Sequence, residues 1–220
     1  MALSSYGSEP VNDLRRAYLR RKGIIESRIR EFERFLGRDE EDIFAELCFC
    51  ICTPQSKARV CDRAVSRMKE MGVLLGGSVE DISSGLRGVR FRQKKARYII
   101  TAREQFSREG HIKIKKKLSG HLDIEGLREW MVANVKGLGY KEASHFLRNV
   151  GLGFDMAILD RHILKNLKLA GVIQTIPASL SRKRYLEIES RMRAFSEEID
   201  IPLKHLDLLL WSQETGEVFK

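Results

Sequence analysis

Helical periodicity runs through almost the whole chain and limits the fold more than any other feature. Apolar residues recur at three- and four-residue spacing, first from Leu14 to Leu19 and then from Ile25 to Leu36, and no convincing strand-like alternation is found. The 220 residues include 4 prolines, and 43% are hydrophobic, which is enough for a large core. The pattern predicts a compact all-α fold of two helical lobes around a cleft, with residues 1–220 forming one unit.

Breaks between the apolar stretches set the expected helices. The most apolar helix runs from Ile43 to Ile51 and ends near Thr53, because Pro54 disfavours helical geometry in the residue before it. Ser56 is expected to cap the helix that follows. Further helices are expected at 92–106, 122–134, 140–150, 157–171, 181–199 and 202–213, and a solvated connector is expected at 113–117.

Positive charge is in excess, with 40 Lys and Arg residues against 30 Asp and Glu residues and a formal net charge of +10. Such an excess favours a polyanionic partner through counterion release, although an inert basic surface is the alternative. The densest early cluster, from Arg90 to Arg97, is expected to be a solvated helix face or a phosphate contact. No apolar run reaches the roughly 18 residues of a membrane span, so a cytoplasmic protein is expected.

The four cysteines cluster around one expected helix end, at Cys48, Cys50, Cys52 and Cys61. Without a secretory signal they indicate a reducing compartment. No His or Cys pair completes a familiar zinc spacing, so buried small hydrophobic residues are the favoured interpretation. We expect no metal and no cofactor.

A pair of glycines in the second half of the chain marks a turn that could position reactive side chains. Gly137 and Gly139 bracket one apolar residue within an expected helical hairpin at about 127–150, where positive φ angles would let backbone N–H groups approach a partner closely. The following helix would offer its N-terminus to a phosphate. Lys141 lies just inside that helix, and Asp160 comes nineteen residues later. An amine and an acid in this setting indicate chemistry on DNA.

The sequence Val135-Lys136-Gly137-Leu138-Gly139-Tyr140-Lys141-Glu142-Ala143 resembles the hairpin of the helix-hairpin-helix DNA glycosylases, and Asp160-Arg161-His162 matches their downstream Asp-x-His. Residues 141–149 and the terminus 211–220 are similar to the archaeal-type 8-oxoguanine DNA glycosylase/lyases, the second family with this activity. The resemblance covers most of the chain and is most distinctive from 135 to 220.

Two features depart from the superfamily pattern. The stretch Gly151-Leu152-Gly153-Phe154 lacks the proline that many members carry before the aspartate. No cysteine follows Cys61, whereas endonuclease III-like relatives carry four near the C-terminus for an iron–sulfur cluster, so no cluster is expected.

The resemblance implies a bifunctional DNA repair enzyme that flips 8-oxoguanine out of duplex DNA and excises it. Asp160 would stabilise the positive charge that builds on the deoxyribose, and Lys141 would attack C1′ to give a Schiff base and then β-elimination. A neutral amine is needed, so Lys141 requires burial or cationic neighbours. Taken alone, Asp160 could cap a helix and Lys141 could contact a phosphate; taken together with the hairpin, they indicate catalysis.

The C-terminal segment is expected to recognise the base. The resemblance implies that Lys220 folds into the base pocket, where its terminal carboxylate would accept the N7–H that 8-oxoguanine has and guanine lacks. Trp211 and Phe219 are candidates for stacking, although Trp211 could instead complete the apolar face of its own helix. Asp207, four residues before Trp211, could accept hydrogen bonds from the guanine edge.

Two more polar residues are candidates for DNA binding, alongside Gly137 and Gly139. Gln55 occupies a turn from which related glycosylases insert a polar side chain into the gap left by the flipped nucleotide, although a turn residue needs no such role. His162 could contact a phosphate or be structural. The expected partner is duplex DNA containing 8-oxoguanine or an abasic site, bound by a monomer.

Two rival functions remain open. A non-enzymatic helix-hairpin-helix module would explain the glycines and the charge, but not the pairing of Lys141 with Asp160. A glycosylase for oxidised pyrimidines would keep the same catalytic pair and differ in the base it removes.

Overall fold

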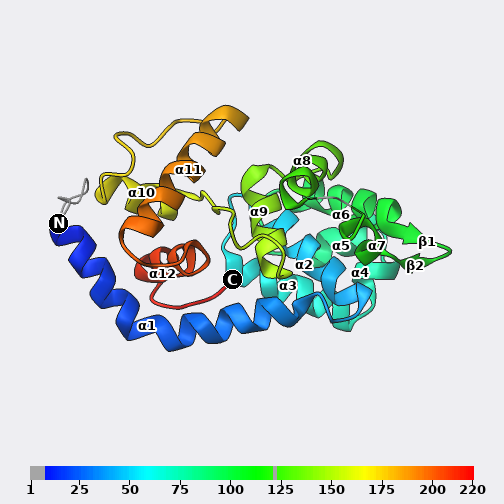
Figure 1. The fold of residues 1–220 in the computed structure, drawn as a ribbon. Helices are drawn as coiled ribbons and strands as arrows, with labels where there is room; N and C mark the ends of the chain where they lie inside the picture. Colours follow the sequence, from blue (N-terminus) through cyan, green and yellow to red (C-terminus); the bar gives the residue numbers. More distant parts are fainter. Residues whose placement is uncertain (1–7, 121–122) are drawn as a thin grey trace. The chain divides into compact units, whose positions relative to one another are not determined.

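The computed structural model describes residues 8–120 and 123–220, and helices dominate this part of the chain (Figure 1). In chain order the elements are α1 (Ser8–Phe35), α2 (Glu40–Cys52), α3 (Ala58–Glu70), α4 (Val73–Gly76), α5 (Val79–Gly85), α6 (Arg92–Phe106), β1 (Ser107–Arg108), β2 (His111–Ile112), α7 (Ile114–Leu118), α8 (Ile124–Asn134), α9 (Tyr140–Asn149), α10 (Arg161–Leu169), α11 (Arg182–Glu198) and α12 (Leu203–Thr215). The predicted all-α class is confirmed.

The chain divides into two compact units. Unit 1 combines the chain up to Glu33 with Gly153–Lys220, and therefore holds most of α1 together with α10, α11 and α12. Unit 2 is the continuous segment Arg34–Leu152 and holds α2 to α9 with the two short strands.

Helix α2 is the core of unit 2. Every residue from Leu47 to Cys52 is buried, because α3, α6, α7 and α9 all pack against this helix. Its apolar composition on all sides is what such an enclosed position requires. The four cysteines are buried and unbridged, as predicted, and burial raises the pKa values of Cys48, Cys52 and Cys61, which keeps these thiols protonated.

Within unit 1, hydrogen bonds join α1 to helices near the C-terminus. The Tyr18 hydroxyl of α1 lies 2.8 Å from Nδ1 of His205 in α12, and Arg15 Nε donates to the carbonyl oxygen of Ile199 at 3.2 Å. Burial lowers the pKa of His205 and favours its neutral ring in this position. These contacts fix α1 against α12 and the end of α11.

Several boundaries differ from the sequence predictions. The two N-terminal amphipathic stretches form one helix, α1, because Gly23 between them costs only about 1 kcal/mol of helix propensity. The predicted connector at 113–117 is largely the short helix α7, whose Ile114 is buried. The helix predicted at 157–171 begins only at Arg161.

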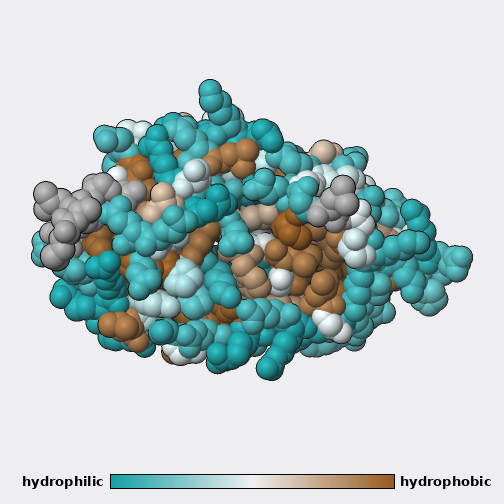
Figure 2. All heavy atoms as spheres, in the orientation of Figure 1, coloured by the Kyte–Doolittle hydropathy of each residue, from teal (hydrophilic) through white to brown (hydrophobic). Residues whose placement is uncertain are grey.

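A small antiparallel ladder was not predicted. Ser107 pairs with Ile112 and Arg108 with His111, and the intervening Glu109 and Gly110 both have positive φ angles, as a tight hairpin turn requires. Two residues per strand are too few to give a readable alternation. The visible surface around this hairpin is hydrophilic (Figure 2). No helix in the described part of the chain is long and apolar enough to cross a membrane.

Candidate active site

The turn between α8 and α9 uses its two glycines differently. Gly137 has φ +92°, and a Cβ there would lie 2.6 Å from Cδ2 of Tyr98, so the turn needs glycine on both counts. Gly139 has φ −100° and ψ −172°, so the positive φ expected there is wrong. It is the N-cap of α9, and its N–H donates to Oε2 of Glu142 at 3.2 Å.

Contacts between α8 and α9 brace this hairpin. The buried Arg128 of α8 donates to Oγ of Ser144 at 3.2 Å, and its guanidinium lies 5.7 Å from the ring centre of Tyr140. The Tyr140 hydroxyl donates to the carboxylate of Glu129, also on α8. The first turn of α9, which carries Lys141, therefore starts from a rigid base.

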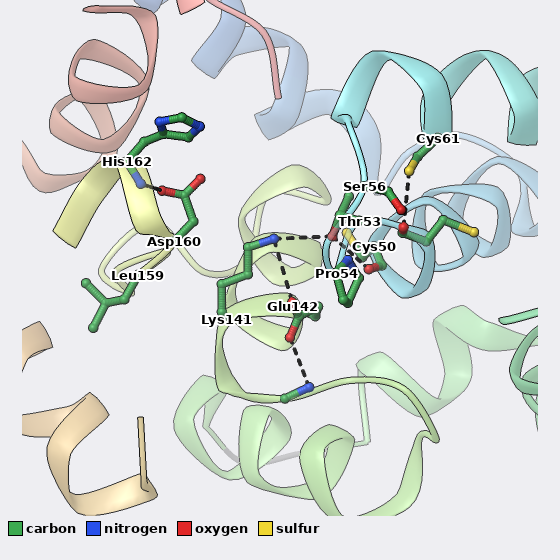
Figure 3. A network of polar contacts seen from close by, with 12 residues as sticks. Cys50, Thr53, Pro54, Ser56, Cys61, Lys141, Glu142, Leu159, Asp160 and His162 are labelled. Carbon is green, nitrogen blue, oxygen red and sulfur yellow. Dashed lines mark hydrogen bonds and ion pairs between the residues drawn. The ribbon is translucent and has the colours of Figure 1, made fainter. Parts of the chain in front are cut away.

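Lys141 is held by a specific acceptor as well as by its backbone. Its Nζ donates to Oγ1 of Thr53 at 3.2 Å and lies 3.7 Å from Oε1 of Glu142 (Figure 3). The Thr53 hydroxyl in turn donates to the carbonyl oxygen of Cys50 at 2.9 Å, which leaves its oxygen to accept from Lys141. The Lys141 side chain is 21% exposed, so the amine is restrained but still accessible to a substrate.

Polar contacts in the interior keep α2 beside α9. Asn149 Nδ2 of α9 donates to Oε1 of the buried Glu46 of α2 at 2.6 Å. His145 is also buried, and its ring meets the ring of Phe49 edge-on, with centroids 5.6 Å apart. Because these contacts fix the two helices to each other, the turn after α2 stays next to Lys141.

The turn after α2 is held by Lys95, a residue whose burial was not predicted from the sequence. Lys95 lies in the basic cluster expected to be a solvated helix face or a phosphate contact, yet it is buried and donates to the turn. Ser56 is not the cap of α3, which is Lys57; the Ser56 hydroxyl oxygen instead accepts from the Arg90 N–H at 3.0 Å and from Lys95 Nζ at 3.1 Å. Spacing alone could not show which member of the cluster turns inward.

Asp160, in unit 1, is the N-cap of α10. One oxygen, Oδ1, accepts the N–H groups of His162 and Ile163, both at 2.8 Å (Figure 3). Among the described residues nothing donates a hydrogen bond to Oδ2. From the sequence, helix capping and catalysis were alternative roles for Asp160. The geometry allows both, because Oδ1 caps the helix and Oδ2 could face a substrate.

The segment leading to Asp160 is fixed by α11. The Tyr185 hydroxyl donates to the carbonyl oxygen of Ala157 at 2.6 Å and accepts the N–H of Leu159 at 3.3 Å, while Glu189 Oε2 accepts the N–H of Ala157 at 2.8 Å. Sequence reasoning missed Tyr185 and Glu189. Their four-residue spacing on one face of a predicted helix was the available signal.

The C-terminal segment folds back onto α12. The helix ends at Thr215 and is capped by Gly216, with φ +81°, and Phe219 is only 5% exposed. The rings of Phe219 and Trp211 lie 6.2 Å apart at 36°, and Lys220 Nζ lies 6.0 Å from the centre of the Phe219 ring. Phe219 is therefore buried within unit 1 and packs beside the half-buried Trp211.

Glu214 links the end of α12 to α10. Its carboxylate accepts from Lys165 Nζ at 2.9 and 3.0 Å and from Asn166 Nδ2 at 3.3 Å, and it lies 3.8 Å from His162 Nδ1. Hydrogen bonding from Lys165 lowers the pKa of Glu214. The helix capped by Asp160 and the helix that carries the terminus are thus joined by a carboxylate that sequence reasoning missed.

The other predicted site residues have varied environments. Asp207 is buried, and its Oδ1 accepts the N–H of Leu208 at 2.8 Å. Gln55 is exposed and has φ +56°, an unfavourable angle for a residue with a Cβ. In the described part of the chain, no group of three or more His, Cys, Asp or Glu side chains is placed to hold a metal ion.

An all-α fold with a lysine opening the second helix of a helix-hairpin-helix motif defines the class of helix-hairpin-helix DNA glycosylases. The chain belongs to the family described as 8-oxoguanine DNA glycosylase, whose model matches residues 25–201.

Relatives with this description match nearly the whole chain. The 8-oxoguanine DNA glycosylase/AP lyase of Fusobacterium nucleatum is 41% identical over 214 residues, covering 97% of this chain and 99% of the relative. The crystal structure of the Methanocaldococcus jannaschii enzyme with a 15mer DNA containing 8-oxoguanine has a TM-score of 0.83 and 40% identity, covering 96% and 98%. The Thermotoga maritima enzyme has a TM-score of 0.84 and 38% identity, covering 96% and 99%.

Proposed function

We propose that this chain is a bifunctional DNA repair enzyme that excises 8-oxoguanine from duplex DNA and cleaves the strand at the resulting abasic site. The observation that carries the proposal is the near full-length similarity to relatives named 8-oxoguanine DNA glycosylase/AP lyase. The similar structure with DNA containing 8-oxoguanine supports the same substrate.

Lys141 is proposed as the nucleophile. Its amine, restrained by Thr53, attacks C1′ of the flipped nucleotide as the glycosidic bond breaks and the base leaves with the bonding electrons. The sugar ring opens to a Schiff base between Lys141 and C1′. Loss of a C2′ proton then expels the 3′ phosphate by β-elimination, and water hydrolyses the Schiff base to free the amine.

Asp160 is proposed to stabilise the positive charge that develops on the deoxyribose. The cap geometry supports this role because α10 orients the carboxylate through Oδ1 and leaves Oδ2 for the substrate. The contacts of Tyr185 and Glu189 to the preceding segment keep that orientation fixed.

The C-terminal segment is proposed to recognise the base. The terminal carboxylate of Lys220 accepts the N7–H of 8-oxoguanine, while Trp211 and Phe219 provide an aromatic surface and Asp207 meets the base edge. Normal guanine presents a lone pair at N7, which repels the carboxylate. The packing of Phe219 on Trp211 supports an ordered reader.

The backbone of Gly137 and Gly139 is proposed to lie against the DNA phosphates, with His162 as a further phosphate contact and Gln55 filling the gap left by the flipped base. The exposed position of Gln55 on a strained turn supports its insertion. We place the enzyme in the cytoplasm as a monomer.

Borohydride trapping tests the proposal. The chain should form a covalent adduct with duplex DNA containing 8-oxoguanine, and Lys141→Gln should form none. No adduct under conditions where DNA is bound would instead indicate a non-enzymatic module. Faster single-turnover excision of thymine glycol than of 8-oxoguanine would indicate an enzyme for oxidised pyrimidines.

A further inference from the structure

Lys95 of α6 is a buried lysine whose donors all point to one turn. Its side chain reaches the carbonyl oxygens of Cys52 and Pro54, both at 2.7 Å, and the Ser56 hydroxyl at 3.1 Å. The residue is 4% exposed, and its three acceptors are uncharged. Burying an ammonium group against neutral oxygens is costly, so such a residue is a candidate for a functional role rather than a stabilising one.

This turn also carries the acceptor for Lys141. Thr53 lies between Cys52 and Pro54, the two residues whose carbonyl groups Lys95 binds, and Thr53 Oγ1 receives the Lys141 amine at 3.2 Å. A short path of hydrogen bonds and backbone therefore runs from Lys95 to Lys141, all within unit 2.

The turn needs an external anchor. Gln55 at its tip has a left-handed backbone, φ +56°, which is uncommon for a residue with a Cβ. Lys95 bonds residues on both sides of Gln55, and the Arg90 N–H adds a bond to Ser56 at 3.0 Å. Without the ammonium group, this backbone would relax and carry Thr53 with it.

Charge acts at the same place. Burial lowers the pKa of Lys95; the neighbouring Cys52, Cys61 and Glu142 oppose this effect, and repulsion from the Lys141 ammonium adds to it. The charges of Lys95 and Lys141 are therefore close enough to interact.

We propose that Lys95 is a positioning residue for the nucleophile: its ammonium group holds the Thr53–Ser56 turn so that Thr53 presents its hydroxyl oxygen to the Lys141 amine. This inference rests on the proposed role of Lys141. It makes Lys95 more important for the chemical step than for the affinity for DNA, to which Gln55 of the same turn is proposed to contribute.

The test is Lys95→Met in the full chain, which keeps the length of the side chain and removes its donors. Single-turnover borohydride trapping at saturating 8-oxoguanine duplex should slow by about 30-fold, as expected when a reacting group is displaced by about an ångström. Affinity for a duplex with an uncleavable tetrahydrofuran abasic site should change by less than about threefold. The control is Lys116→Met, which removes an exposed lysine of α7 in the same unit and should leave the saturating rate unchanged.

A double-mutant cycle with Thr53→Val separates positioning from general stability. If Lys95 acts through Thr53, the double variant should be no slower than the slower single variant, whereas independent effects would multiply. If Lys95→Met fails to fold, Thr53→Val is the test. A slower trapping rate with unchanged affinity for the tetrahydrofuran duplex would support the inference.

Trapping by Lys95→Met at the unmodified rate, multiplying effects in the cycle, or an unmodified rate in Thr53→Val would each overturn it. Failure of the unmodified chain to trap DNA would reject the proposed function itself. The two failures are therefore distinguishable.

Discussion

Lys141, the proposed nucleophile, and Asp160, the proposed acidic residue, are held in different ways. The Asp160 carboxylate is oriented by the N–H groups of His162 and Ile163, two and three residues later, so its own hydrogen bonds are local, although α11 holds the segment before it. Lys141 depends on Thr53, eighty-eight positions earlier in the chain, and through that turn on Lys95. A local cap survives most changes elsewhere, whereas a long-range network fails when any of its members is lost. The contribution of Asp160 to the reaction rate should therefore depend mainly on its own charge. That of Lys141 should depend also on distant residues.

The sharpest test of the local side is Asp160→Asn. Asparagine caps helices as well as aspartate does, so folding and DNA binding should be retained, while base excision should fall by about 100- to 1,000-fold through loss of the charge. Single-turnover excision of 8-oxoguanine measures the effect. Asp160→Ala is the matched variant: it should lose excision similarly and also about 1 kcal/mol of stability. Near-normal excision by Asp160→Asn would leave capping as the only role.

Gly137 and Gly139 form a second matched pair. Gly137→Ala should destabilise the fold by about 1–3 kcal/mol, because φ is +92° and the new Cβ would meet Tyr98 at 2.6 Å. Gly139→Ala should cost less, since φ is −100° and its Cβ would meet only the end of the Glu142 side chain at 3.2 Å. Urea unfolding of both variants measures the difference. Equal losses would show that the two positions are not constrained as described.

Variants at Lys220 test whether the C-terminal segment of unit 1 recognises the base. Deleting Lys220, or extending the chain beyond it, should lower excision of 8-oxoguanine relative to cleavage of a preformed abasic site by about tenfold, since one hydrogen bond to the base is lost. Parallel single-turnover assays on the two substrates give the ratio. A loss of the same size on both would count against the terminus as a base reader.

The smallest expected effect concerns Glu214, whose pKa is lowered from 4.5 chiefly by the hydrogen bond from Lys165. The ionised carboxylate stabilises the fold above the unfolded pKa, and this stability is lost as pH falls through the lower folded pKa. Glu214→Gln should therefore lower the melting temperature at pH 7, by an amount equivalent to less than about 1 kcal/mol, and have little effect near pH 3. A larger effect at pH 3 than at pH 7 would contradict the assigned ion pair.

The sequence predicted what is local in this molecule. The bounds of α6 were predicted as observed, and α8, α9, α11 and α12 were placed to within a few residues, because helical periodicity is a property of neighbouring positions. The start of α10 was placed too early because apolar residues continue through Leu159, while the cap lies at Asp160.

Tertiary partners could not be predicted in the same way. Nothing in the spacing from Arg90 to Arg97 distinguishes the buried Lys95 from its exposed neighbours, and the choice depends on the carbonyl groups of a turn some forty residues earlier. Ser56 was predicted to cap the nearest helix, yet its hydroxyl accepts a hydrogen bond from Lys95 of α6 instead. Proposed catalytic residues were readable from a motif, whereas the residues that orient Lys141 required the structure.

Mass spectrometry of the borohydride-trapped complex is the most direct test of the central claim. After digestion of the protein and the DNA, the peptide containing Lys141 should carry the reduced deoxyribose adduct on its ε-amino group, and Lys95 should be unmodified. An adduct at another lysine or at the N-terminal amine, with Lys141 unmodified, would contradict the account.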